Sequence, residues 1–373
     1  MPRVIGIDPG TLSVDVCGLD DGQLFLDRSL STTEALADPS VLVGLLDGAA
    51  PLDLVTGPSG YGLPLIFARD LTEADLKLAY LAAEGEDGGI GGLRSLMRSL
   101  ARLSTPVVLT PGVVHLPSVP AHRKVNRVDM GTADKVCAAA LAIREQADRR
   151  GCGERDVSFI LLELGGAFTA AVAVRDGRIV DGAGGTSGPL GMRSAGALDG
   201  EVAFLAGSVP KRLLFGGGVA TIAGAPDAPA EALAAPSTVN GRLAWEAYVE
   251  SAVKAVAALA VSVPRADDVI LSGRLARVPG VRDEFARRFG GFRGRTSGSI
   301  PTVDPSPSVH VLTGFAAVAS QAAQGAALLA DGLAGGRAAA LVDALGIREA
   351  AGTVLDHLYV ISPTAARARL GLT

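Results

Sequence analysis

The stretch that decides the fold is residues 4–11, VIGIDPGT, which returns in altered form at residues 159–166, FILLELGG. Each copy is an apolar run that ends in an acidic residue, Asp8 or Glu163, followed by a glycine-containing turn. Each turn leads into a second apolar run and then into a charged glycine turn. Short β-branched runs separated by glycine turns are typical of β-hairpins. The sequence therefore predicts two domains of related topology, each beginning with a hairpin.

Helical and strand patterns complete an α/β chain. An alanine-rich run from residue 133 to Arg150 has an apolar face at helical spacing, a capping hydroxyl before it at Thr132, and Gly151 directly after it. This run predicts a long helix. Further helices are expected at residues 242–261, 281–289 and 314–329, strands at residues 107–109 and 269–271, and, in the tail after residue 331, a helix and a strand near residues 358–361.

Length and composition favour two domains. The chain has 373 residues, of which 48% are hydrophobic and 20% are charged. One hydrophobic core rarely grows beyond roughly 250–300 residues. We expect one lobe over residues 1–149, a second over residues 150–312, and a final segment, residues 313–373, that returns to the first lobe.

Charge and hydropathy argue against several kinds of partner. The net charge is −5 and no basic stripe is present, so nucleic acid is not expected as a ligand. Charged residues interrupt the apolar stretches before they reach the length of about 20 residues that a membrane span needs. The start has no apolar leader, so we expect a cytoplasmic protein. The three cysteines lack metal-ligand spacing and predict neither a disulfide framework nor a metal site.

The two acid-glycine turns are the candidate sites of chemistry. Each acid is followed by small residues that can donate hydrogen bonds, namely Gly10, Thr11 and Ser13 after Asp8, and Gly165 and Gly166 after Glu163. Such turns surround an anion with donors and let a carboxylate hold the water shell of a metal ion. An Asp-Pro-Gly sequence is also an ordinary turn. The equivalent placement of both turns in two related copies favours a joint site.

A third element, residues 267–281, is a strand that runs into Ser272 and Gly273 and then, through Pro279 and Gly280, into a new helix. The missing side chain at Gly273 would let a flat base approach the backbone. Every α/β protein contains strand–turn–helix connections, so this one is informative only through its place in the order of elements. That order is an acid-glycine hairpin, a helix, a second acid-glycine hairpin, and then this strand, turn and helix.

With these motifs in this order, the sequence resembles the acetate and sugar kinase, heat-shock chaperone and actin superfamily along essentially its whole length. The resemblance implies an actin-like ATPase fold, with two duplicated ribonuclease H-like α/β lobes around a nucleotide cleft. It implies ATP and Mg²⁺ as cofactors, with Asp8 and Glu163 holding the metal ion through water. The phosphates would bind to the small residues of the two turns, and the adenosine to Ser272, Gly273 and Arg274.

Two further stretches, residues 128–135 (VDMGTADK) and 184–202, are similar to a group described as probable butyrate kinases. This resemblance implies phosphoryl transfer to a short-chain carboxylate, giving an acyl phosphate. A carboxylate acceptor needs a cation, and the rigid guanidinium of arginine suits that role. Arg193 is the first candidate, and Arg123 and Arg127 are others.

Other acceptors and activities stay open. A sugar or polyol acceptor would need a carboxylate base, for which Asp129 and Asp199 are the candidates. A chaperone-like or actin-like ATPase with a protein partner is also compatible with the sequence, as is a non-catalytic nucleotide sensor or filament subunit. A small-molecule substrate is the favoured partner, and a homodimer is a possible assembly.

Overall fold

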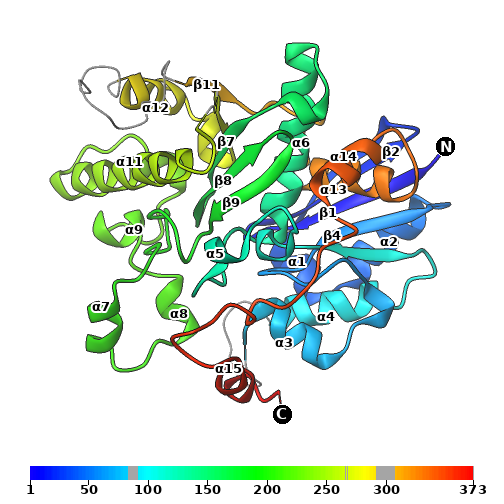
Figure 1. Cartoon of the computed structure of the whole chain (residues 1–373), viewed down its shortest axis with the longest axis horizontal. Coiled ribbons are helices and arrows are strands. Elements are labelled where there is room, and N and C mark those ends of the chain that lie inside the picture. The colour runs from blue at the N-terminus through cyan, green and yellow to red at the C-terminus, as the bar shows by residue number, and fades with distance from the viewer. Residues whose placement is uncertain (83–90, 265, 267, 291–306, 373) are drawn as a thin grey trace.

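The computed structural model describes residues 1–82, 91–264, 266, 268–290 and 307–372 (Figure 1). Two mixed β-sheets form the centres of two lobes. The first has the strand order β3-β2-β1-β4-β6-β5 and the second β11-β10-β7-β8-β9. The strands of the first sheet are β1 (Arg3–Pro9), β2 (Ser13–Asp20), β3 (Gln23–Ser31), β4 (Leu54–Pro58), β5 (Ile66–Phe67) and β6 (Val107–Thr110). Those of the second are β7 (Phe159–Leu164), β8 (Thr169–Arg175), β9 (Arg178–Ala183), β10 (Asp268–Ser272) and β11 (Ser308–Val311).

The two sheets repeat one topology. In both, the first three strands form an antiparallel meander, β1-β2-β3 or β7-β8-β9. The first strand of each meander then pairs in parallel with β4 or β10, and that strand pairs in parallel with β6 or β11. The predicted duplication of a hairpin-initiated lobe is thereby confirmed.

Two alanine-rich helices, α6 (Ala133–Arg150) and α13 (Gln321–Leu333), pack against each other between the sheets (Figure 1). Small residues allow this close approach. A Cβ atom at Gly325 of α13 would lie 1.8 Å from the carbonyl oxygen of Cys137 in α6, and one at Gly6 of β1 would lie 2.1 Å from the backbone nitrogen of Ala327. The long helix predicted from residue 133 to Arg150 is confirmed.

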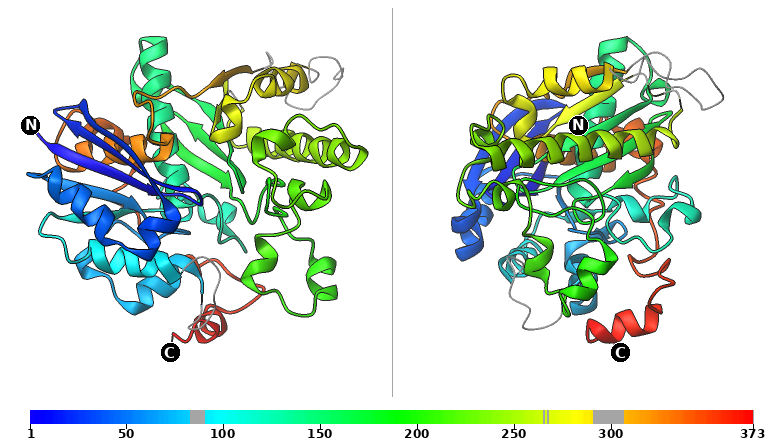
Figure 2. Two further views of the ribbon diagram at one scale, coloured as in Figure 1. Left: turned by 180° about the vertical axis from the view of Figure 1, so that it is seen from behind. Right: turned by 90° about the vertical axis from the view of Figure 1, so that its left-hand side faces the viewer.

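The remaining helices cover the outer faces. Helix α11 (Val239–Ala260) packs on β7, β8 and β9, on the far side of the second sheet from the first lobe (Figure 2). The others are α1 (Thr32–Ala37), α2 (Ser40–Gly48), α3 (Glu73–Tyr80), α4 (Gly91–Leu100), α5 (Ala121–Lys124), α7 (Gly200–Leu205), α8 (Lys211–Leu214), α9 (Val219–Ile222), α10 (Ala230–Leu233), α12 (Val281–Gly290), α14 (Ala339–Leu345) and α15 (Pro363–Arg369). The helices expected at residues 242–261 and 281–289 correspond to α11 and α12.

The crossover between β11 and α13, which contains residues 313–319, differs from the prediction. The helix expected from residue 314 begins only at Gln321, because side chains accept the N–H groups of residues 313–319 in place of helical carbonyls. Glu145 accepts those of residues 313 and 314, the Gln324 side chain those of 315 and 316, and Asp27 those of 317, 318 and 319. Three elements, β3, α6 and α13, therefore hold this crossover.

The strand predicted near residues 358–361 is wrong. The backbone N–H groups of Tyr359 and Val360 donate to the Asn126 side chain, at 2.7 and 3.0 Å, instead of to a neighbouring strand. Their side chains are exposed, so the apolar run does not reflect burial in a sheet.

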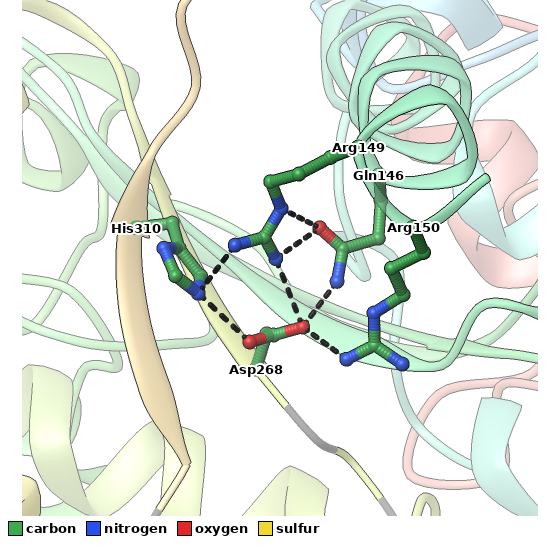
Figure 3. A network of polar contacts seen from close by, with 5 residues as sticks. All are labelled: Gln146, Arg149, Arg150, Asp268 and His310. Carbon is green, nitrogen blue, oxygen red and sulfur yellow. Dashed lines mark hydrogen bonds and ion pairs between the residues drawn. The ribbon is translucent and has the colours of Figure 1, made fainter.

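A buried carboxylate fixes the C-terminal end of α6 to the second sheet (Figure 3). Asp268, at the start of β10, is 3% exposed and accepts hydrogen bonds from Gln146, Arg149 and Arg150 of α6. His310 of β11 lies 3.0 Å from its other oxygen. A buried charge of this kind is tolerated only when it is paired and hydrogen-bonded. The network therefore makes the end of α6 part of the second lobe.

The cysteines are all free. Cys17 and Cys137 are buried and Cys152 is exposed. Burial raises the pKa of the Cys17 and Cys137 thiols to about 12. No helix in the described part of the chain is both long enough and apolar enough to cross a membrane.

Candidate functional site

The two acid-glycine turns are built alike. Gly10 lies two residues after Asp8, and its N–H group donates to the carbonyl of Ser13 at 2.8 Å. Gly165 lies two residues after Glu163, and its N–H group donates in the same way to the carbonyl of Phe168 at 3.0 Å. The amides of these two glycines therefore close the turns. The amides of Thr11 and Gly166, at the turn tips, take no part in this closure.

A lysine that the sequence analysis did not select lies among the acids. The first turn of α6 carries Asp134 and Lys135, and the Lys135 ammonium is 2.5 Å from Oδ2 of Asp134 and 2.9 Å from Oε1 of Glu163. Thr132 also donates to Asp134. Burial disfavours the charge on Lys135, but the carboxylates of Asp134 and Glu163 outweigh it and raise the pKa of the ammonium. Lys135 is therefore a permanent cation in this site.

Burial disfavours the ionised form of two of these acids. Burial and the nearby Asp134 raise the pKa of Asp8 to about 7, against the lowering effect of a hydrogen bond from Ser320. Burial also raises the pKa of Glu163, although Lys135 opposes this. For Asp134, burial is outweighed by the Lys135 ion pair, which lowers its pKa. Three acids around one ammonium leave an excess of negative charge that a further cation would neutralise.

This donor set fits Mg²⁺. Carboxylate oxygens are the ligands that Mg²⁺ prefers, and the ion usually keeps several waters while using one or two carboxylates and the phosphates of a substrate. Within the described ranges, no group of three or more His, Cys, Asp or Glu residues forms a direct metal-ligand set. Asp8 and Glu163 are the two acids of this set that lie near the ends of β1 and β7. Two residues that the sequence analysis did not select act on these acids: Ser320 donates a hydrogen bond to Asp8, and the charge of Asp134 raises the pKa of both Asp8 and Glu163.

The third predicted element lies beside the second turn. Strand β10 runs parallel to β7, so Ser272 pairs with Glu163. The position of a Cβ atom at Gly166 is 3.9 Å from Cδ of Arg274. The Arg274 guanidinium forms an ion pair with Glu231 of α10. Ser272 is buried, and its hydroxyl has no hydrogen-bond partner among the described residues.

The backbone geometry itself requires glycine at residue 273. Its φ is +82°, in the region that favours glycine. A Cβ atom there would lie 2.7 Å from the carbonyl oxygen of Leu164 and 3.2 Å from Cγ of Glu163. The missing side chain therefore lets β7 and this turn approach each other, which supports the position of Glu163.

Asp129 connects two loops. It is 5% exposed. Its Oδ2 atom accepts hydrogen bonds from the backbone N–H and the hydroxyl of Thr186, at 2.9 and 2.8 Å, and Oδ1 accepts one from the N–H of Gly131 at 3.2 Å. A carboxylate with these contacts orders the loop that precedes α6.

Among the described residues, no contact joins Lys135 to the other acceptor candidates, which are Arg193, Asp199, Arg123 and Arg127. The exposed Arg193 guanidinium donates to the carbonyl of Pro226, although the Arg193 backbone N–H donates to Ala167 in the second turn at 2.9 Å. Asp199 caps α7 by accepting the N–H groups of residues 201 and 202. Arg123 and Arg127 line a cavity of about 550 Å³ between α5, β9 and α11, whose lining does not include Asp8 or Glu163.

The duplicated sheets, the matching acid-glycine turns and the two helices packed between the lobes define an α/β protein with the actin-like ATPase fold. The chain belongs to the family whose model is described as "Protein of unknown function (DUF1464)", which matches residues 6–360. A comparison with curated protein sequences gives no match.

Solved structures of acid kinases share this fold. A propionate kinase from Francisella tularensis subsp. tularensis SCHU S4 aligns with a TM-score of 0.58 at 15% identity, over 87% of this chain and 99% of that chain. An acetate kinase from Porphyromonas gingivalis aligns with a TM-score of 0.56 at 14% identity, over 87% and 98%. An acetate kinase from Entamoeba histolytica gives 0.54 at 11%, over 78% and 87%. At these identities the likeness shows the fold alone, and it confirms the predicted fold.

Proposed function

We propose that this protein is an ATP-dependent phosphotransferase whose acceptor is a short-chain carboxylate and whose product is an acyl phosphate. The observation that carries the proposal is the position of Lys135 between Asp134 and Glu163, close enough to Asp8 to affect the pKa of that acid. The names of the structural neighbours, propionate and acetate kinases, support an acid as acceptor.

Phosphoryl transfer asks a protein mainly for positioning and charge neutralisation. In this proposal, Asp8 and Glu163 hold Mg²⁺ through water, and the ion, when bound, neutralises phosphate charge. Gly10 and Gly165 keep the turns narrow, while Thr11, Ser13 and Gly166 face the phosphates. Ser272, Gly273 and Arg274 border the adenosine. Lys135 adds a fixed positive charge close to the transferred group.

The acceptor chemistry needs no base. A carboxylate oxygen attacks the γ-phosphorus, the bond from that phosphorus to the bridging oxygen breaks, and its electron pair leaves with ADP. The contacts of the two candidate bases support this choice over a sugar or polyol. Asp129 already accepts three hydrogen bonds, and Asp199 is an exposed helix cap.

The proposal is tested by incubating the protein with Mg²⁺, ATP and hydroxylamine, together with a panel of short-chain acids, sugars and polyols. An acyl phosphate reacts with hydroxylamine to give a hydroxamate, whereas a sugar phosphate does not. We expect hydroxamate with at least one acid. ADP formed with a polyol but never a hydroxamate would assign an alcohol kinase, and ADP formed only with added protein fractions would assign a partner-dependent ATPase.

Arg193→Ala tests the first acceptor candidate in the same assay. We expect hydroxamate formation to be lost while ATP binding, measured by calorimetry, persists. Arg242→Ala is the matched control, because Arg242 is also exposed and also donates to a backbone carbonyl, that of Ser237. Equal hydroxamate rates for both variants would remove Arg193 from the acceptor site.

A further inference from the structure

The cavity between α5, β9 and α11 has a positively charged lining (Figure 1). Its volume of about 550 Å³ lies in the range of roughly 300–1,000 Å³ that is typical of sites for small organic ligands. Arg123, Arg127 and Lys254 line this cavity together with His122 and one acid, Asp181. Arginine and lysine are both charged at neutral pH, so the three cations exceed the single carboxylate by two charges.

The carboxylate of Asp181 already has its partners. Its Oδ1 atom accepts the N–H group of Gly182 at 2.8 Å, and Oδ2 accepts the hydroxyl of Ser262 at 2.6 Å. The Nε atom of Arg123 lies 3.7 Å from the same Oδ2 atom, and the Arg123 guanidinium also donates to the carbonyl of Val180 at 2.7 Å. Asp181 therefore neutralises Arg123 and holds it in the wall of the cavity.

The other two cations are available to a ligand. Arg127 is exposed, and its side chain makes no hydrogen bond or ion pair within the part of the chain that the structure describes. Lys254 pairs with Glu250, one turn earlier on α11, but these side chains are 74% and 52% exposed. Exposed pairs of this kind contribute little to stability, so the Lys254 ammonium can turn to an anion in the cavity.

We propose that this cavity binds a phosphorylated small molecule, at a site separate from the turns of Asp8 and Glu163. Guanidinium groups form paired hydrogen bonds with phosphate oxygens. A phosphate monoester carries about two negative charges near pH 7, which matches the two-charge excess, whereas a carboxylate carries one. Val125, Ala255 and Leu259 line the same cavity and would contact an apolar or aromatic part of the ligand. This inference is independent of the proposed function.

The test is a calorimetric titration of the whole chain with phenyl phosphate, benzoate and inorganic phosphate. Phenyl phosphate has both the ring and the double charge, benzoate has the ring with a single charge, and inorganic phosphate has no ring. The titrations are made with Mg²⁺ and a non-hydrolysable ATP analogue at saturating concentration, so that neither turn is left open to the probe. We expect one phenyl phosphate per chain and a Kd about tenfold lower than for either other probe, as the loss of one charged hydrogen-bonded contact or of one apolar contact would give.

Three variants locate the site. Arg127→Ala should raise the Kd for phenyl phosphate about tenfold, because it removes one charged pair of hydrogen bonds, and Arg127→Glu should raise it further. Lys254→Met should raise it by a smaller factor. Arg242→Ala is the matched control, because Arg242 is also exposed on α11 but lies outside this cavity lining.

The fold of each variant is checked by circular dichroism, and the exposed Arg127 can be replaced without removing a contact of the folded chain. An unchanged Kd in Arg127→Ala would overturn the inference, as would no binding of phenyl phosphate at millimolar concentration. Displacement of phenyl phosphate by the ATP analogue would place the phosphate at the acid-glycine turns instead. Benzoate or inorganic phosphate binding as tightly as phenyl phosphate would overturn the assigned class of ligand.

Discussion

Ser320 and Asp8 are 312 residues apart in the sequence, yet the Ser320 hydroxyl donates a hydrogen bond of 2.7 Å to Oδ2 of the Asp8 carboxylate. The same hydroxyl oxygen caps α13 by accepting the N–H group of Ala323 at 3.1 Å. The acid of the first turn is therefore attached to the helix that follows the crossover between the lobes.

Asp8→Asn should stabilise the nucleotide-free protein at pH 8. The folded-state pKa of Asp8 is raised to about 7 by burial and by Asp134. Ionisation of Asp8 therefore lowers the free energy of unfolding once the pH exceeds the ordinary carboxyl pKa, and this loss is complete above pH 7. Removing the charge while keeping an acceptor for Ser320 should raise the free energy of unfolding by about 1–2 kcal/mol. Thermal unfolding with and without Mg²⁺-ATP checks this, because the variant should also lose the increase in Tm caused by the ligand. Exposed Asp283→Asn is the control, and a lower Tm for apo Asp8→Asn would contradict the account.

Lys135→Met should strongly destabilise the protein. It leaves Asp134 and Glu163 without their common partner, and breaking a buried ion pair typically costs about 3–5 kcal/mol. Lys254→Met, at an exposed pair, should cost no more than about 1 kcal/mol. Denaturant titration measures both. Mg²⁺ at millimolar concentration should recover part of the loss at Lys135, and equal losses in the two variants would refute the central role of this ammonium.

Gly273→Ala and Gly280→Ala form a matched pair. Their φ angles are +82° and +83°, so both substitutions carry backbone strain. A Cβ atom at Gly280 meets nothing within 4 Å, whereas one at Gly273 meets the Leu164 carbonyl at 2.7 Å. We expect Gly280→Ala to cost about 1 kcal/mol and Gly273→Ala at least about 1–3 kcal/mol more. Similar losses of Tm would show that contact with β7 is not what requires glycine at residue 273.

His115 should make stability fall in mild acid. Burial, and secondly Lys124, lower its pKa to about 4. A base with a depressed folded-state pKa loses stability as the pH falls below its unfolded value, here between about pH 6.5 and 4. The free energy of unfolding of the wild type minus that of His115→Leu should be constant above pH 7 and fall by about 3 kcal/mol across this window. A difference that does not vary with pH would exclude this histidine as the cause.

The parts of the fold that were predictable depend on local sequence. Each hairpin is encoded within about twenty consecutive residues by β-branched runs and glycine turns, and α6 by its periodicity and its caps. The start of α13 was not predictable in this way. It depends on Asp27 and Glu145, which are distant in sequence and accept the N–H groups that an earlier helical turn would have used.

The same distinction between local and distant residues applies to the candidate site. Asp8 and Glu163 stand out because each ends an apolar strand at a glycine turn. Lys135 becomes significant only once β7 lies beside α6, although one indication was available. An Asp-Lys pair in the first turn of an otherwise apolar helix is notable, because charged residues are rarely buried unless paired. The contact of Gly273 with β7 depends on parallel pairing, which its own turn does not encode.

The three thiols described above make the protein suitable for labelling with a fluorescent dye at a single site. Cys17 and Cys137 are buried with raised pKa values, so they react slowly, whereas Cys152 is exposed just after the end of α6. A maleimide dye should therefore attach at Cys152 without prior replacement of the other two cysteines. A second cysteine placed on the first lobe would then let energy transfer follow the distance between the lobes as ATP and the acceptor bind.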